Sequence, residues 1–397
     1  MKKLLALSTI TVSLFASNAI LGVKVDQSLS DIKANSSLWM AADFQKIELY
    51  PQTAVFMSDE NAHKKNIIAV SKEALVGVLY NDKEIAFKLI WPDNTKDIQL
   101  ANSTDSFADG FAVQLPQEIK NASSLPYIGM GDDNNPVVVY LNKAVQSIAK
   151  SPEGDNKDRL ASLSLNLYGQ ELTDFEQQAK SKVMTSAYSK AFVAKGFGST
   201  TEIRDDEYKF STDMKYDNDR WNGVVVKNIK DSYSNQDANG AFLVAFAAWD
   251  GKRDNRDGMK LLSSWQPVTL PDKKDSINLN AINQPVEGDI EKGREVAIAN
   301  CASCHWFQGA ETAPAYMAPG LYNIGGYATT EYIKDSILKP NKVIVPGYNA
   351  NAHSAFLWYT EADGVKTSTM PGYDWLDKES LNNLMAYLKT LKQEAKR

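Results

Sequence analysis

Two cysteines and a histidine lie together near the C-terminal end of the sequence, in the run Cys301-Ala302-Ser303-Cys304-His305, and both of the chain's cysteines are here. The pattern C-x-x-C-H is typical of the attachment of c-type haem. Because cysteines three positions apart are separated by about one helical turn, both thiols can bond the vinyl groups of one porphyrin. The adjacent histidine is then placed to ligate the iron. The chemistry that these residues predict is electron transfer.

A redox-active disulfide and a structural zinc site are the two alternatives to haem attachment for these cysteines. A redox-active disulfide of the thioredoxin type follows a strand in a β-α-β pattern, whereas residues 291–300 have a polar, helical pattern. A structural zinc site needs four ligands, and only His63 and His353 remain to supply further imidazoles. The sequence therefore favours haem c over a disulfide or a zinc ion.

The elements predicted around this motif occur in a recognisable order within residues 289–397. A helical pattern ends at the motif, and a loop with Pro319-Gly320-Leu321, a helical pattern at Thr330–Leu338 and a methionine loop follow. Apolar residues at helical spacing behind Asp377, a suitable N-cap, predict a last helix. These residues are Leu381, Leu384, Met385, Leu388 and Leu391. The whole segment resembles class I cytochrome c, a small all-α fold.

The resemblance to class I cytochrome c implies that Cys301 and Cys304 bind haem c covalently and that His305 is the proximal iron ligand. Gly293 and Tyr387 stand where that family packs its first helix against its last. The family often has an aromatic residue at the position of Val296, so this contact is expected to be looser here.

The sixth iron ligand implied by the resemblance is Met370, in the run Thr367-Ser368-Thr369-Met370-Pro371-Gly372. A thioether is a soft ligand that favours ferrous iron and raises the reduction potential. Met317 and His353 are the alternatives, and His353 would give a bis-histidine iron of lower potential. A methionine that only fills space in the core is a further alternative.

The first residues predict export. Lys2 and Lys3 precede a short apolar stretch that ends in Ala16-Ser17-Asn18-Ala19, which is the arrangement of a secretory signal peptide over residues 1–19. An uncleaved membrane anchor is the alternative, but the apolar run is short and carries several Ser and Thr residues. No later segment has about 18 consecutive apolar residues, so no membrane span is expected after cleavage. We therefore expect a soluble protein in the periplasm, which is where cytochromes of this kind receive haem.

Length and charge limit the function further. The 397 residues are enough for two or three domains, and the net charge is −6. An acidic chain without a basic cluster argues against binding of nucleic acid. If both cysteines are thioethers, no disulfide remains, and stability must come from packed cores and bound cofactors.

Residues 20–270 are expected to form one domain rich in strands. The turn-forming pair Asn81-Asp82 separates β-rich runs at 74–80 and 85–91, which predicts a hairpin. Many short strands with turns between them are typical of an antiparallel β-sandwich. Further strands are predicted at 110–115, 136–140, 221–226 and 241–249.

One helical insertion is expected within this strand-rich region, near residues 173–195. Thr173-Asp174-Phe175-Glu176 has the form of a capping box, and the helix is expected to run from there towards Gly196. Residues 271–288 are polar and lack periodicity, so we interpret them as a linker to the domain at 289–397.

Two motifs in the strand-rich region give a second resemblance. Leu125-Pro126-Tyr127-Ile128-Gly129-Met130-Gly131-Asp132 leads through Asn135-Pro136-Val137 into a predicted strand, and Val244-Ala245-Phe246-Ala247-Ala248-Trp249-Asp250-Gly251 leads to Gly258-Met259-Lys260-Leu261-Leu262-Ser263-Ser264-Trp265. In this order the motifs resemble the haem-binding gamma subunit of ethylbenzene dehydrogenase and related type II enzymes of the dimethyl sulfoxide reductase family. Members of that family are commonly the sandwich alone, whereas this chain adds the cytochrome c segment.

The second resemblance implies a β-sandwich that holds one haem b between Met130 and Lys260. A lysine ligates iron only as the neutral amine, and its free pKa is about 10.4. Burial and the charge of the iron must therefore both favour loss of the proton. The ordinary alternatives are a solvated side chain for Lys260 and core packing for Met130.

Together the two resemblances imply a periplasmic dihaem electron-transfer protein without substrate turnover of its own. The implied partners are the molybdopterin and iron–sulfur subunits of a molybdenum-dependent oxidoreductase, together with a soluble redox carrier. One alternative is a cytochrome c fused to a sandwich that binds carbohydrate or another ligand, because sandwiches serve many functions. Another is a peroxidase, which would need an open iron position or a second C-x-x-C-H, and the sequence has no second one.

Overall fold

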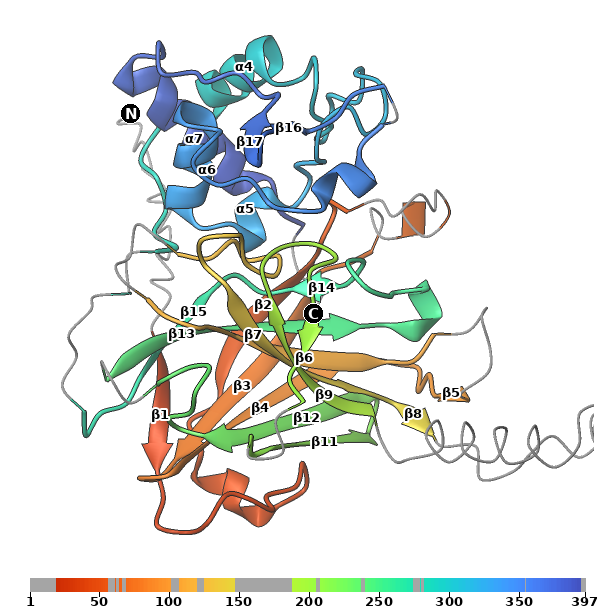
Figure 1. Cartoon of the computed structure of the whole chain (residues 1–397), viewed down its shortest axis with the longest axis vertical. Coiled ribbons are helices and arrows are strands. Elements are labelled where there is room, and N and C mark those ends of the chain that lie inside the picture. The colour runs from red at the N-terminus through yellow and green to blue at the C-terminus, as the bar shows by residue number, and fades with distance from the viewer. Residues whose placement is uncertain are drawn as a thin grey trace, which may run out of the picture.

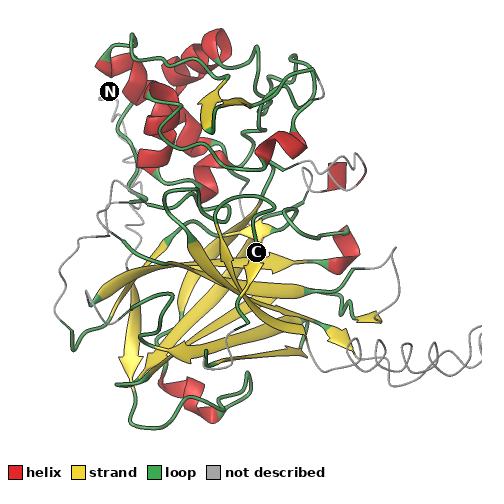
Figure 2. Cartoon of the chain, in the orientation of Figure 1, coloured by secondary structure: helices red, strands yellow, loops and turns green. Residues whose placement is uncertain are grey.

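The computed structural model describes residues 19–55, 61, 64–65, 69–100, 107–119, 125–146, 188–204, 208–236, 240–273, 279, 282–353 and 355–393. The chain forms two parts that pack directly on each other (Figure 1). We call residues 19–273 the β-domain and residues 282–393 the helical domain, after their main elements (Figure 2). Among the described residues, none of the helices combines the length and the hydrophobicity needed to span a bilayer.

The β-domain contains strands and two short 3-10 helices. Its strands are β1 (Ile20–Lys24), β2 (Gln45–Pro51), β3 (Lys72–Tyr80), β4 (Glu84–Pro92), β5 (Gln99–Leu100), β6 (Gly110–Pro116), β7 (Val137–Lys143), β8 (Val145–Gln146), β9 (Tyr188–Ala194), β10 (Thr201–Glu202), β11 (Phe210–Asp217), β12 (Arg220–Asn228), β13 (Ala241–Trp249), β14 (Leu261–Leu262) and β15 (Gln266–Thr269). The 3-10 helices are η1 (Ser37–Ala41) and η2 (Gly251–Arg253). All the strands predicted from sequence are present.

The main sheet is folded into the two layers of a sandwich. One layer has the order β10-β9-β7-β6-β13, and the other has the order β2-β3-β4-β12-β11. Strand β14 joins β13 to β2, and β1 pairs with both β15 and β3, so the layers are connected along one side. Most pairs are antiparallel, including β3 with β4, which confirms the predicted hairpin at Asn81-Asp82. The predicted antiparallel sandwich is therefore confirmed.

Strand β13 shows how the sequence divides the apolar core. Its even-numbered residues from Phe242 to Ala248 belong to the core between the two layers, with Phe87 of β4 and Phe111 of β6. Its odd-numbered residues from Ala241 to Trp249 belong to a second core, which includes residues of the helical domain. A strand that is covered on both faces is expected to be continuously apolar, as β13 is.

The predicted helical insertion is wrong over its last residues. Residues 188–194 form strand β9, which pairs antiparallel with β7 over its whole length, from Tyr188 opposite Lys143 to Ala194 opposite Val137. The capping box is a local signal, whereas Tyr188, Phe192 and Val193 are good strand formers whose backbone groups are satisfied by the neighbouring strand. The rest of the expected helix, residues 173–187, lies outside the described residues, as do residues 1–18 of the expected signal peptide.

The helical domain contains the helices expected from the sequence. Its elements are α4 (Ile290–Asn300), α5 (Ile324–Tyr327), α6 (Thr330–Leu338), η3 (Tyr348–Asn351), β16 (Tyr359–Ala362), β17 (Val365–Ser368) and α7 (Lys378–Thr390). Asp377 is the N-cap of α7, and its carboxylate accepts a hydrogen bond from Ser380 N at 2.8 Å. This confirms the cap predicted from the sequence.

The domain is not purely α, because β16 and β17 form a hairpin. Its turn residues Asp363 and Gly364 both have positive φ, 51° and 75°, as a two-residue hairpin turn with this twist requires. The pair Asp-Gly is a strong sequence signal for a hairpin, although this hairpin was not among the predicted elements.

Helices α4 and α7 pack closely where Gly293 faces α7. A Cβ added to Gly293 would overlap the backbone carbonyl of Asn383 and would lie 2.8 Å from Tyr387 Cβ. Val296 packs at the margin of the same core. The expected contact of Gly293 and Tyr387 between the first and last helices is therefore present.

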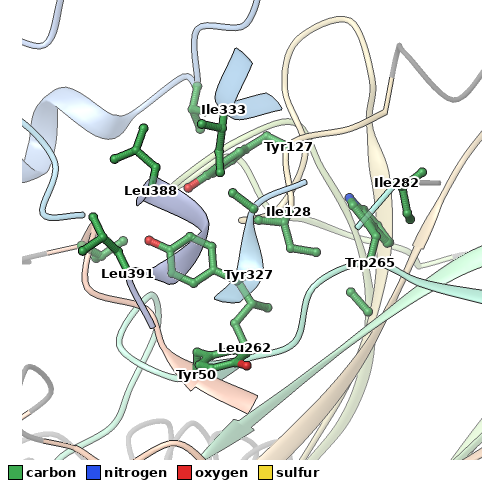
Figure 3. Packing of buried hydrophobic residues seen from close by; sticks show 14 of the residues in the cluster. Tyr50, Tyr127, Ile128, Leu262, Trp265, Ile282, Tyr327, Ile333, Leu388 and Leu391 are labelled. Carbon is green, nitrogen blue, oxygen red and sulfur yellow. The ribbon is translucent and has the colours of Figure 1, made fainter. Parts of the chain in front are cut away.

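The two domains share one apolar core (Figure 3). Tyr327 of α5 lies between Leu391 and Ile128, with Tyr50 and Leu262 below it in the view. Three of these five residues come from the β-domain. Burial of large side chains on both sides of the contact makes this an interior rather than a loose surface contact.

Polar contacts also join the domains and fix the segment between them. Asn323 Nδ2 donates a hydrogen bond to Pro51 O at 3.1 Å. Asn283 Nδ2 donates to Trp265 O at 2.7 Å, and Thr330 N donates to Ile282 O at 3.2 Å. The described end of the expected linker is thus held by both domains.

Candidate functional site

The C-x-x-C-H residues form a tight turn at the end of α4. Cys301 is the C-cap, and its N–H donates to Ala297 O at 2.8 Å. The carbonyl of Cys301 accepts hydrogen bonds from Cys304 N at 3.1 Å and from His305 N at 2.9 Å. The backbone therefore gathers both thiols and the imidazole onto one turn, which is the arrangement that attachment of one porphyrin requires.

His305 is held in a defined orientation. Its Nδ1 lies 2.8 Å from Pro319 O, and since a carbonyl only accepts, Nδ1 carries the proton and donates. Burial lowers the pKa of His305, although the Pro319 carbonyl opposes this. A neutral imidazole with protonated Nδ1 leaves the Nε2 lone pair available for a metal, as in many metal-ligating histidines.

The two cysteines do not have the properties of a redox dithiol. Both are free in the structure, and burial raises the pKa of the Cys301 thiol to about 11. Reactive C-x-x-C thiols have a lowered pKa instead. Among the described residues, the only group of three or more His, Cys, Asp or Glu side chains close enough to share a metal ion contains neither cysteine. His63 lies outside the described residues.

Met370 lies in the loop after β17 and is partly buried. Met370 N donates to Ser368 Oγ at 3.1 Å, and Thr369 N donates to Trp358 O at 3.1 Å. The Thr369 hydroxyl donates to the same carbonyl at 3.0 Å. Two hydrogen bonds from Thr369 therefore hold the loop against Trp358. A held loop of this kind can present a thioether in a fixed position.

The structure also describes the two alternative iron ligands, Met317 and His353. Met317 is partly buried, and its N–H donates to Pro314 O at 3.2 Å. His353 is partly buried in a loop, where its Nδ1 accepts a hydrogen bond from Ala355 N at 3.0 Å.

In the β-domain, Met130 sits at the tip of an unusual turn. Its φ is 83°, in the left-handed region that a residue with a side chain rarely adopts, and the next residue, Gly131, has φ 77°. Gly131 N donates to Tyr127 O at 2.8 Å, and the buried carboxylate of Asp132 accepts from Tyr127 N at 3.2 Å. Such backbone strain is typically found at functional positions, where the surroundings hold it in place.

Lys260 is a buried lysine with no charged partner. Its side chain is among the buried residues, and its Nζ lies 5.5 Å from the centroid of the Trp249 ring. In the described part of the chain, no carboxylate forms a salt bridge with it. Burial lowers the pKa of Lys260 to about 8, opposed only by the negative charge of Asp257. This is the direction that a lysine ligand requires.

Two other buried lysines differ from Lys260, because the ammonium group of each has a polar partner. Lys227 Nζ forms a salt bridge with Asp231 at 2.7 Å and donates to Gln236 Oε1 at 2.7 Å. Lys88 Nζ donates to Ala34 O at 2.7 Å. Because buried ammonium groups are normally satisfied in this way, the isolated Lys260 points to a function.

The segments that carry Met130 and Lys260 meet at the end of the sandwich that faces the helical domain. Met130 O accepts from Gly196 N at 2.9 Å, and the neighbouring Phe197 ring would lie 2.8 Å from a Cβ on Gly258. On the other side, Gln52 N donates to Lys260 O at 2.9 Å. Two residues far apart in the sequence therefore belong to one local structure.

The sheet below these segments carries small side chains. Ala247 of β13 pairs in register with Ala112 of β6, and Ala245, two residues along, lies on the same face. Trp249 continues this face towards Lys260. Small side chains on adjacent strands give a flat floor, which suits a planar ligand such as a porphyrin.

Sequence reasoning missed three aromatic residues that lie between the two sites. Tyr127 is buried next to the Met130 turn, and it contacts Tyr348 of η3 at a centroid distance of 5.7 Å. Tyr348 in turn contacts Trp358 at 6.0 Å. Tyr127 stood within a motif singled out from the sequence, but nothing in the sequence pointed to Tyr348 or Trp358.

A small pocket marks the place where the two domains meet beside His305. Trp306, Ala318 and Gly320 line it from around the histidine and its Pro319 partner. Thr53 and Ala54 line it from the β-domain, directly after β2. The attachment turn of the helical domain therefore lies against the β-domain.

A separate cluster of buried carboxylates occupies the loops after β4 and β13. Asp93, Asp109 and Asp250 have oxygens within 4.8 Å of one another, and Lys72 Nζ lies 3.4 Å from Asp93 Oδ2 and 3.2 Å from Asp250 Oδ2. Burial raises the pKa of Asp109 to about 7, although Gly251 N, Asp97 N and Trp221 Nε1 all donate to it.

Comparison with known proteins adds to this geometry. The family model "Ethylbenzene dehydrogenase" matches residues 36–260, and the model "Cytochrome c" matches residues 290–392. Both resemblances seen in the sequence are thereby confirmed. Each match covers the residues of one of the two candidate sites.

Two curated relatives are similar over part of the chain. One, provisionally named respiratory nitrate reductase heme subunit, from Haloferax mediterranei, is 26% identical over 46% of this chain and 51% of its own length. The other, chlorate reductase subunit gamma from Ideonella dechloratans, is 27% identical over 45% of this chain and 57% of its own length. The chain thus spans little more than half the length of the curated relatives that it matches.

Among solved structures, a family 9 carbohydrate-binding module from Caldicellulosiruptor kristjanssonii in complex with cellotriose is 10% identical, with a TM-score of 0.30. It covers 64% of this chain and 94% of that one. A TM-score this low supports no conclusion about fold or ligand. Because the family model at residues 36–260 matches more than half of the chain, the protein belongs to the ethylbenzene dehydrogenase family, and it carries a cytochrome c segment after that region.

Proposed function

We propose that this chain is an exported dihaem electron-transfer subunit, with haem b in the β-domain and haem c in the helical domain. The observation that carries the proposal is that Lys260, which is buried and forms no salt bridge within the described part of the chain, and the strained Met130 turn meet at the end of the sandwich that faces the C-x-x-C-H domain. The names of the two curated relatives, a heme subunit and a gamma subunit of reductases, agree with this role.

In the helical domain, Cys301 and Cys304 would bind haem c through thioethers, and His305 and Met370 would ligate its iron. When bound, each haem supplies a one-electron ferric–ferrous couple. The chain's own contribution is positional. The Pro319 carbonyl keeps the His305 proton on Nδ1, so that Nε2 faces the metal as a neutral donor.

In the β-domain, Met130 and Lys260 would ligate the iron of haem b. The apolar surroundings of Lys260 reduce the cost of freeing its amine, since they already lower its pKa to about 8. The alanines on β6 and β13 offer a flat floor, and Met130, in the turn at Gly129-Met130-Gly131, packs against the same apolar core. The residues present therefore fit the cofactor that the family suggests.

The proposed partners are a molybdopterin subunit and an iron–sulfur subunit of an oxidoreductase, and a soluble redox carrier. The chain would not turn over substrate itself, because it serves to move electrons between these partners. The segment at residues 1–19 would direct it to the periplasm. Co-purification of the chain from its host, followed by detection of molybdenum, tests the partnership.

The spectrum of the purified, exported chain tests the cofactors. We expect the pyridine haemochrome to show equal amounts of b-type and c-type haem, and mass spectrometry to show one porphyrin bonded at Cys301 and Cys304. A spectrum with c-type haem alone would overturn the assignment of the β-domain. An unmodified pair of thiols would overturn the assignment of the helical domain.

Substitution of the lysine tests the ligands of haem b directly. Lys260→Ala and Met130→Ala should each lose most haem b while keeping haem c. The matched control is Lys88→Ala, because Lys88 is also buried and its Nζ also lies over a tryptophan ring, that of Trp39 at 5.5 Å. Unchanged haem b in both site variants would instead favour a sandwich that binds another ligand.

A further inference from the structure

A continuous series of contacts leads away from the Met130 turn. Tyr127, three residues before Met130, packs edge-on against Tyr348 with a centroid distance of 5.7 Å. Gly129, the neighbour of Met130, is equally close, because a Cβ placed on it would lie 2.8 Å from Tyr348 Oη. Gln52, whose backbone binds Lys260 O, donates from Nε2 to Tyr348 Oη at 3.3 Å. Tyr348 of the helical domain thus contacts the Met130 segment directly and is connected to the backbone of Lys260 through Gln52.

The series continues from Tyr348 to the methionine loop. The Trp358 ring packs edge-on against Tyr348 at 6.0 Å, and Trp358 N donates to Asn349 Oδ1 at 2.8 Å. Trp358 O accepts from both the N–H and the hydroxyl of Thr369, the residue before Met370. The contacts therefore reach from one expected iron ligand to the other, and Tyr348 and Trp358 are the two links between them.

The surroundings of this series are apolar and packed. Tyr127 and Tyr348 are only 3% and 7% exposed, and Phe197 covers Tyr348 at a centroid distance of 5.9 Å. Burial raises the pKa of both phenols well above the ordinary value, so both rings stay neutral. Tyr127 and Tyr348 are therefore shielded from water, whereas Trp358 is partly buried and lines the pocket beside His305.

We propose that Tyr348 and Trp358 provide the electronic coupling between the two haem sites of this chain. The inference rests on the proposed function, since it requires both cofactors. Electron transfer through a protein depends steeply on how completely atoms fill the path, and each gap weakens it. In the step, one electron leaves the ferrous iron of one site and reduces the ferric iron of the other. No bond forms or breaks, and the rings are not oxidised.

Tyr348 also joins the two domains. It belongs to the helical domain but contacts Tyr127, Gln52 and Phe197 of the β-domain. The same ring therefore fixes the separation of the two sites and fills the space between them. A chain that carries both cofactors in this way does not need a diffusional encounter between them.

The test measures electron equilibration within the full chain loaded with both cofactors. One electron is injected by pulse radiolysis, and the b-type and c-type bands are followed separately in time. Tyr348→Leu and Trp358→Leu should each slow the equilibration several-fold, with haem contents and reduction potentials close to those of the unsubstituted chain. Tyr348→Phe and Trp358→Phe, which keep an aromatic ring, should retain most of the rate.

The matched control is Tyr327→Leu. Tyr327 is buried in the same interface beside Leu391 and Ile128 (Figure 3), but among the described residues it forms no ring contact or hydrogen bond with Tyr348 or Trp358. The rate of electron equilibration in Tyr327→Leu should equal that of the unsubstituted chain. Equal rates in Tyr327→Leu and in the two leucine variants of the series would overturn the proposal.

Two further outcomes separate the possible failures. If the unsubstituted chain binds no haem b, the proposed function fails and the coupling proposal fails with it. If both cofactors bind and the leucine variants equilibrate at the normal rate, only the coupling proposal fails. Should Tyr348→Leu not fold, Trp358→Leu decides alone, since Trp358 is only partly buried and its loss should be tolerated.

Discussion

Gln52 Nε2 of the β-domain donates a hydrogen bond to Tyr348 Oη of the helical domain at 3.3 Å, although the two residues are 296 positions apart in the sequence. The pair lies inside a core that both domains share. A buried hydrogen bond of this kind leaves one group unsatisfied if its partner is removed or displaced while the interface stays closed. The relative position of the two domains is therefore part of the folded structure, and substitutions on either side of the contact should affect both.

Gly129→Ala tests this contact from the β-domain. The added Cβ would lie 2.6 Å from Tyr127 Cε1, 2.8 Å from Tyr348 Oη and 3.0 Å from Gln52 Nε2. Overpacking of this kind costs about 1–3 kcal/mol. We expect the free energy of unfolding in urea to fall by that amount and haem b content to fall with it, because Met130 is the next residue. Unchanged stability and haem b content would show that the turn adapts freely and does not fix the domains.

Gly293→Ala tests the packing of α4 against α7. The new methyl group would overlap the Asn383 carbonyl, so the helices must move apart, again at about 1–3 kcal/mol. We expect a lower free energy of unfolding and a smaller yield of protein with covalent haem. Glu295→Ala is the control, because Glu295 is exposed on the same helix and should change stability by no more than about 0.5 kcal/mol. Equal losses in both variants would refute the packing argument.

Met370→Ala tests the sixth ligand of the haem c iron. We expect covalent haem to be kept, because the thioethers are untouched, while the iron becomes accessible to small added ligands and its reduction potential falls. Met317→Ala and His353→Ala are the controls, and both should keep the spectrum and potential of the unsubstituted chain. If His353→Ala rather than Met370→Ala opened the iron, the iron would be bis-histidine.

The attachment motif Cys301 to His305 could be found from sequence because its signal is local, whereas Met370, Met130 and Lys260 followed from the resemblance to known families. The turn Cys301 to His305 is five consecutive residues, and the strands of the sandwich follow from short apolar runs such as β13. The same reliance on local signals caused the error at β9, where pairing with β7 prevails over a helical pattern that began at residue 173.

Tyr348 and Trp358 could not have been found in the same way. Their importance comes from neighbours contributed by the other domain, such as Tyr127 and Gln52, and no pattern near residue 348 encodes these contacts. The hairpin β16–β17 is a different case, because Asp363-Gly364 was a readable signal in the sequence. What the sequence lacked was the contact between domains, and this is where the proposed function is concentrated.

The buried carboxylates give a prediction for the dependence of stability on pH. Asp109 faces the carboxylates of Asp93 and Asp250. Both of these pair with Lys72, and Asp250 also pairs with Arg253. The pKa of Asp109 is raised by burial from 3.8 to about 7 in the folded chain. Between these two values the folded state binds a proton that the unfolded state has lost. The contribution of Asp109 to stability is therefore complete below pH 3.8 and is lost as the pH rises through about 7.

We expect the free energy of unfolding to fall between pH 5 and pH 8 by at most about 3 kcal/mol from this group, and Asp109→Asn to remove most of that fall. Because N–H groups donate to both side-chain oxygens of Asp109, the NH₂ group of the amide would face at least one of these donors. The variant should therefore be less stable at pH 5, while its stability changes less with pH. Asp82→Asn is the control, because Asp82 is exposed and its pKa is lowered by the salt bridge with Lys24. Urea unfolding at both pH values measures the difference. Parallel pH profiles for Asp109→Asn and the unsubstituted chain would mean that Asp109 stays ionised in the fold, held by its three N–H donors and by Lys72.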